Sequence, residues 1–146
     1  MSSSGGPMSR LVLTALVLAS TAAFARDTRL LLPIADVFAM PEATGRLDPN
    51  FRFFFGRQAA PEGERRGEVV ANTKTNAANK SDVEACKWVM LSALVELQDR
   101  AKKVGATSVV AIDSWYKKVT FTSETEYECH VGNIVSGVTL KGQALR

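Results

Sequence analysis

The clearest pattern of apolar and polar positions along the chain lies between residues 82 and 104. Apolar side chains recur there at steps of three and four, as expected for one face of an α-helix. These positions are Cys86, Met90, Ala93, Leu97, Ala101 and Val104. Ser81 and Glu84 match a capping box, in which each side chain accepts a hydrogen bond from the other residue's backbone amide. With Gly105 suited to the position after a helix end, the sequence predicts a helix over residues 82–104.

After Gly105 the period of the apolar positions changes to two, which is typical of β-strands. Residues 108–116 and 134–141 predict two strands, and residues 125–131 predict a third strand between them with two distinct faces. Its inner face would carry Thr125, Tyr127, Cys129 and Val131, and its outer face Glu124, Glu126, Glu128 and His130. The expected fold class is therefore α+β, with one long helix packed on a small antiparallel sheet and followed by a strand meander.

Weaker patterns occupy the first part of the chain. The apolar run over residues 29–32 predicts a first edge strand, which Pro33 ends. Residues 34–40 predict a short helix, because apolar side chains recur on one side. Residues 68–71 predict a short strand, whereas the polar run over residues 72–80 predicts a connection that leads directly into the long helix.

Four phenylalanines surround Arg52 in residues 51–55. Such a cluster fits a buried strand, because a domain of this size needs aromatic side chains to fill its core. An exposed aromatic cluster would instead mark a surface that binds a partner. The sequence favours the core interpretation and leaves the second one open.

The first 25 residues match a secretory signal peptide. Arg10 supplies the positive charge, residues 11–22 the apolar region, and residues 23–25 a small-x-small cleavage site. The apolar run is shorter than the roughly 20 residues that a membrane-spanning helix needs. We therefore expect cleavage after Ala25, whether translation starts at Met1 or Met8. The product would be a single domain over residues 26–146, periplasmic or secreted, with no membrane span.

Charge excludes one broad class of partner. The formal net charge is +3 for the whole chain and becomes +2 once Arg10 is removed. The basic side chains are interspersed with acidic ones, which is not the pattern of a protein that binds nucleic acid. We therefore expect no nucleic-acid partner.

Cys86 and Cys129 are the only two cysteines. In an exported protein, such a pair predicts one disulfide within the chain, or a link between two chains. Cys86 belongs to the apolar face of the long helix and Cys129 to the inner face of a strand, so the two can meet. A metal site formed with His130 is the alternative, but none of the usual short zinc-ligand spacings is present.

Glu124, Glu126, Glu128 and His130 form a stripe of metal-ligand types on one strand face. Neighbouring members would lie roughly 7 Å apart along the strand, which is too far for tight chelation without further groups. We expect a solvated outer face, no cofactor and no resident metal, with weak divalent-cation binding as the alternative. His130 could also serve as the base of a hydrolase, and Ser123, Ser136, Asp113 or Glu128 could complete a triad with it. No Gly-x-Ser-x-Gly elbow supports a nucleophilic serine, however.

Four blocks of sequence between Asn76 and Gly142 resemble a family of small exported bacterial proteins, often labelled as excinuclease ATPase subunits. These blocks are NKSD with the following CKW, GATSVVAI, YKK and EYEC. The segment from Leu97 to Leu140 is also similar in pattern to RcsF-like and YbjQ-like domains, which implies an α+β fold with a helix before a strand meander. The chain lacks the lipidated cysteine and the second disulfide of RcsF.

The ATPase label itself does not fit the chain. Such an enzyme needs a glycine-rich loop that ends in Gly-Lys-Ser/Thr to hold phosphates, and the nearest segment, residues 132–137, is followed by Val138 and Thr139. The sequence therefore indicates a non-enzymatic protein of the bacterial envelope that binds another envelope protein through its aromatic segment or a sheet edge. The alternative is a periplasmic metal-binding or envelope stress-response module.

Overall fold

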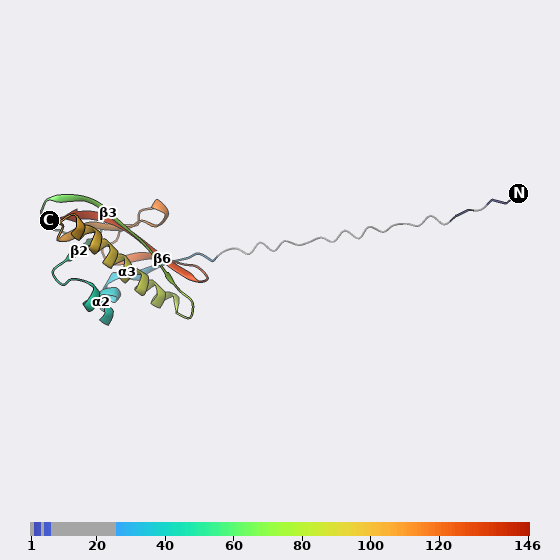
Figure 1. Ribbon diagram of the computed structural model, residues 1–146, viewed down its shortest axis with the longest axis horizontal. Coiled ribbons are helices and arrows are strands. Elements are labelled where there is room, and N and C mark those ends of the chain that lie inside the picture. The colour runs from blue at the N-terminus through green and yellow to red at the C-terminus, as the bar shows by residue number, and fades with distance from the viewer. Residues whose placement is uncertain (1, 4, 7–25) are drawn as a thin grey trace.

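The long helix α3 (Asp82–Lys103) lies across one face of a β-sheet (Figure 1). The computed structural model describes residues 2–3, 5–6 and 26–146, so the apolar region and the cleavage site of the expected signal peptide lie outside the described residues. Ser81 caps the helix, because its Oγ accepts a hydrogen bond from the Glu84 amide at 3.1 Å. Gly105 follows the last turn with φ of 78°, a left-handed conformation that glycine adopts without strain. The expected helix is confirmed.

Strand β6 (Val135–Leu145) is the centre of the sheet. Strand β3 (Arg65–Asn76) runs antiparallel along one side of β6 for its whole length. On the other side, β5 (Glu126–Val131) pairs with the start of β6 and β4 (Ser108–Ser114) pairs with its end, both antiparallel. Three strands thus form hydrogen-bonded ladders with β6, which is eleven residues long.

Two short strands complete the sheet at its other edges. Strand β1 (Thr28–Pro33) pairs antiparallel with β5, and β2 (Arg52–Phe55) pairs parallel with β4. The α+β class and the long helix packed on the sheet are therefore confirmed, but the sheet has six strands and is mixed. Strands β4 and β5 both pair with β6, because β6 is long enough to take them end to end.

Short helical segments connect the strands. Helix α1 (Ile34–Phe38) begins directly after β1, as the sequence indicates, and ends two residues earlier than expected. Helix α2 (Pro41–Arg46) was not expected from the sequence; Pro41 stands at its first position, where the fixed φ of proline suits a helix. A single 3₁₀ turn, η1 (Tyr116–Lys118), follows β4.

The prediction for residues 72–80 was wrong. Strand β3 does not stop at Ala71 but continues to Asn76, through the polar run, and pairs with β6 throughout. Pairing with a neighbouring strand outweighs the low strand propensity of the polar residues. Their side chains also alternate between more and less exposed positions, so the run buries few of its polar groups.

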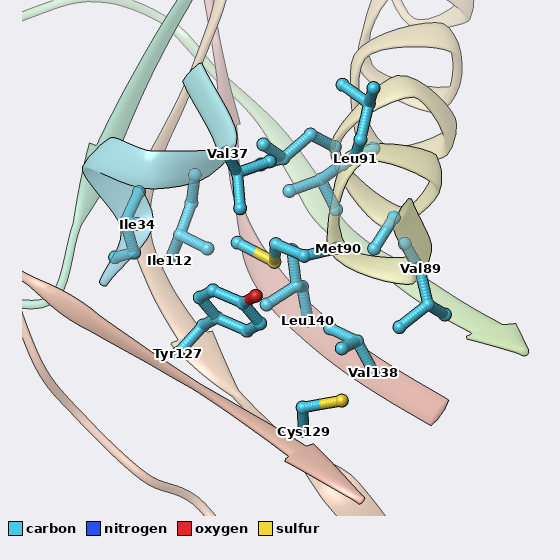
Figure 2. Packing of buried hydrophobic residues seen from close by; sticks show 14 of the residues in the cluster. Ile34, Val37, Val89, Met90, Leu91, Ile112, Tyr127, Cys129, Val138 and Leu140 are labelled. Atoms are coloured by element: carbon cyan, nitrogen blue, oxygen red, sulfur yellow. The ribbon is translucent and has the colours of Figure 1, made fainter. Parts of the chain in front are cut away.

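The core lies between α3 and the sheet, with contributions from α1 (Figure 2). Met90, Leu91 and Val89 of the helix are fully buried in it, and Met90 lies beside Tyr127 of β5 and Leu140 of β6. Burial of each large aliphatic side chain contributes roughly 1.5–3 kcal/mol. The outer face of the helix is left for charged residues.

The aromatic segment belongs mostly to this core. Phe51, Phe54 and Phe55 are each no more than 7% exposed. Phe53 is half-buried and its ring packs at a tilt against that of Phe38, with the ring centroids 5.9 Å apart. The core interpretation is therefore supported, and the segment offers little surface to a partner.

Candidate functional site

The disulfide expected from the sequence is present between Cys86 of α3 and Cys129 of β5. Both side chains are fully buried, and their Cα atoms lie 5.9 Å apart, within the normal range for a disulfide. It ties the helix to the sheet from inside the core. A disulfide of this kind is consistent with an oxidising compartment. Within the described residues, no helix is long and apolar enough to cross a membrane.

The acidic stripe expected on β5 divides into two different environments. Glu124 and Glu126 are exposed. Glu128 is only 5% exposed, and the side chain of His130 is 12% exposed. The expectation of a uniformly solvated face is therefore wrong for Glu128 and His130, because β1 and the segment after β4 cover this part of the sheet.

Glu128 and His130 belong to a network of ionisable side chains that lie within hydrogen-bond distance of one another. One carboxylate oxygen of Glu128 lies 2.9 Å from His130 Nε2, and the other accepts hydrogen bonds from Arg29 at 2.7 and 2.8 Å. His130 Nδ1 lies 2.9 Å from a carboxylate oxygen of Asp27. Tyr116 stacks on the imidazole ring with 3.6 Å between ring centroids. Both oxygens of Glu128 and both nitrogens of His130 therefore have partners.

Both ring nitrogens of His130 are engaged within this network, which bears on metal binding. A metal ligand needs an available nitrogen lone pair, and both nitrogens of His130 already face carboxylate oxygens, which only accept hydrogen bonds when ionised. In the described part of the chain, no three His, Cys, Asp or Glu side chains are arranged to hold a metal ion. The contacts therefore favour a structural role for His130 over the metal-binding alternative.

The serines considered for a hydrolase are engaged elsewhere. Ser136 is fully buried and donates to the Ala85 carbonyl oxygen under α3. Ser123 Oγ accepts hydrogen bonds from two backbone amides of its own loop. Among the described residues, neither serine is hydrogen-bonded to His130, so the structure assembles no Ser–His pair.

Another feature, which the sequence did not reveal, is the long outer edge of β3. In an antiparallel ladder, successive residues turn their backbone groups alternately toward and away from the neighbouring strand. On the side of β6 away from β3, the Thr139 carbonyl oxygen accepts a hydrogen bond from the Trp115 backbone amide. In the pairing of β6 with β3, Thr139 stands opposite Asn72. The backbone of Asn72 therefore faces away from β6.

The same alternation applies along the whole strand. Five residues turn their backbone N–H and C=O groups away from β6. The Asn76 carbonyl oxygen accepts a hydrogen bond from Lys80 Nζ at 3.5 Å, and the other four residues form what we call the β3 edge. They are Glu68, Val70, Asn72 and Lys74. Within the described residues, no other strand pairs with this side, and these four residues make no backbone hydrogen bond to a loop or turn.

An open groove of about 770 Å³ accompanies the β3 edge. Strand β3 forms one wall with Val69, Val70 and Thr73, and helix α3 forms the other with Val95 and Asp99. The strand is twelve residues long, whereas the edge strands β1 and β2 have six and four. An edge of this length, with a groove beside it, can accept an additional strand whose side chains enter the groove.

Comparison with known proteins finds no match to a family model, a curated protein or a solved structure. The resemblance of residues 76–142 to a family of small exported bacterial proteins therefore stays a prediction.

Proposed function

We propose that this chain is a non-enzymatic protein-binding module of the bacterial envelope, which binds an extended strand of its partner along the β3 edge. The observation that carries the proposal is the row of outward-facing backbone groups from Glu68 to Lys74. Backbone N–H and C=O groups form strong hydrogen bonds, and an additional strand would satisfy them in a regular ladder.

Two further observations support this function. The groove between β3 and α3 provides space for alternate side chains of an added strand, which is how such sites obtain specificity. The buried disulfide suits a protein that works in an oxidising compartment. The engaged partners of His130, Ser123 and Ser136 favour binding over catalysis.

The experiment uses a photo-crosslinking amino acid at Val70, in protein produced in a bacterial periplasm. Position 70 is half-buried on the β3 edge. We expect a discrete adduct whose cross-linked partner peptide is identified by mass spectrometry. The same amino acid at Thr122, an exposed position outside β3, serves as the control and should give no such adduct.

A pair of variants tests whether the backbone is what binds. Asn72→Pro removes an outward-facing N–H while leaving the ladder to β6 intact, whereas Asn72→Ala keeps that N–H. Both variants lose the hydrogen bond that Thr139 Oγ1 donates to the Asn72 side chain at 3.2 Å, so the loss of this contact is common to them. We expect the adduct to persist in Asn72→Ala and to disappear in Asn72→Pro. Equal adducts in both variants would contradict the proposal.

A further inference from the structure

We infer that the strand bound along the β3 edge is β3 of a second copy of this chain, antiparallel, with Ala71 opposite Ala71. The inference rests on the proposed function, because it names the partner of the same edge. The two sheets would then join into one that runs through a twofold dimer. Such an interface is self-complementary, since each copy offers the same surface.

The charges on the strand fit this arrangement. Glu68 lies three residues before Ala71 and Lys74 three residues after it. About a twofold axis at Ala71, Glu68 stands opposite Lys74 of the second copy. By the same symmetry, Lys74 stands opposite Glu68 of the second copy, so the dimer has two such pairs. Within the described residues, neither side chain makes an ion pair in its own chain. Opposite charges that face each other across strands stabilise the pairing.

Neighbouring registers lose this complementarity. A twofold axis at Val70 would place Arg66 opposite Lys74 of the second copy, which brings two positive charges together. An axis at Asn72 would place Glu68 opposite Asn76, which leaves the carboxylate without a cation. Charge therefore selects the register centred on Ala71.

The backbone is compatible with this register, as it is with the neighbouring registers centred on Val70 and Asn72. Glu68, Val70, Asn72 and Lys74 all direct their backbone groups outward. In the register centred on Ala71, Glu68 pairs with Lys74 and Val70 with Asn72. Every such pair joins two outward-facing residues, which is what a hydrogen-bonded pair in an antiparallel ladder requires.

The inner face of the strand can also accommodate a second copy. Ala71 is the residue at the axis, and its side chain is fully buried within its own copy. Val69 would stand opposite Thr73 of the second copy, a pair of β-branched side chains that suits a sheet. Both residues line the groove beside α3, so the groove would receive the side chains of the second copy.

Sedimentation equilibrium of the purified, disulfide-bonded protein tests this inference. We expect a reversible dimer that Asn72→Pro abolishes and Asn72→Ala retains. Lys74→Glu alone should weaken dimerisation about tenfold or more, because two attractive pairs become repulsive. Glu68→Lys together with Lys74→Glu should restore it, since the exchanged charges again face each other. Circular dichroism of each variant confirms that it is folded.

The outcomes separate the inference from the proposed function. A monomeric wild-type protein overturns the inference, and so does a dimer that the double charge exchange does not restore. If the protein is monomeric and still gives an adduct at position 70 that Asn72→Pro abolishes, the edge binds a different protein and only the choice of partner is wrong. If both the dimer and the adduct are missing, the proposed function fails as well.

Discussion

At the scale of single residues, Tyr127 has the most unusual environment. Its side chain is 1% exposed and points into the core on the side of Met90 and Leu140 (Figure 2). The hydroxyl oxygen has no hydrogen-bond partner among the described residues. Burial raises the pKa of this hydroxyl well above its usual range, with the charge of Asp36 as a smaller cause. The hydroxyl therefore remains neutral and adds a desolvation cost to folding.

Tyr127→Phe should accordingly stabilise the protein. The substitution removes an unpartnered buried hydroxyl and keeps the ring, so we expect the free energy of unfolding to rise by about 1 kcal/mol. Urea unfolding of the two proteins measures this difference. Tyr116→Phe is the control, because Tyr116 is only half-buried and its change should have little effect. A loss of stability in Tyr127→Phe would mean that the hydroxyl has a partner in solution.

At the scale of elements, β4 contains an irregularity that its sequence conceals. Val109, Val110 and Ile112 suggest a continuous apolar strand, yet the register with β6 shifts between Val110 and Asp113. Ala111 lies in this bulge with φ of 52°, in the left-handed region. A residue with a Cβ atom is strained there by roughly 1–2 kcal/mol.

Ala111→Gly should relieve this strain. Ala111 is exposed, so little packing is lost, and we expect the free energy of unfolding to rise by about 0.5–1 kcal/mol. Ala39→Gly is the matched control, since Ala39 is also exposed but has φ of −78°. It should leave stability unchanged or lower it by up to about 1 kcal/mol. Chemical denaturation of both variants decides the point, and equal effects would argue against strain at Ala111.

The elements also show what the sequence could and could not predict. Helix α3 was predictable because its cap, its apolar spacing and its end are all local features. The disulfide was predictable because each cysteine lies on the buried face of a recognisable element. The extension of β3 to Asn76 depends on pairing with β6, which is more than fifty residues away in the sequence, so no local pattern reveals it.

The environment of the candidate site was equally hidden. Arg29 meets Glu128 only because β1 pairs with β5 in a register that places Arg29 opposite His130. The unpaired β3 edge likewise depends on the order of strands in the sheet. Periodicity assigns a residue to a face of its own strand, but it does not say which strand lies beside it.

At the scale of the whole molecule, the disulfide is the covalent link between the helix and the sheet. Its two cysteines are 43 residues apart in the sequence. Closing a loop of this length in the unfolded chain should contribute on the order of 4 kcal/mol. The bond therefore supplies a large part of the stability expected for one domain.

Replacing Cys86 and Cys129 together with alanine should lower the free energy of unfolding by roughly 3–5 kcal/mol. Guanidinium unfolding of the oxidised protein and of the double variant measures the loss. Wild-type protein treated with dithiothreitol should lose a similar amount, and the variant should not respond to the reductant. A reductant effect on the variant, or none on the wild type, would contradict this role of the disulfide.

The central place of β6 also determines the order in which the molecule can assemble. Residues 135–145 come after every other strand and helix in the chain, yet β3, β4 and β5 all pair with them. Before β6 emerges from the ribosome, β3 has no partner strand, and β1–β5 and β2–β4 remain separate pairs. Two-stranded units of this kind are marginal at best in water. A nascent chain therefore stays largely unfolded until its synthesis reaches β6, which is the state in which a polypeptide can be threaded across a membrane.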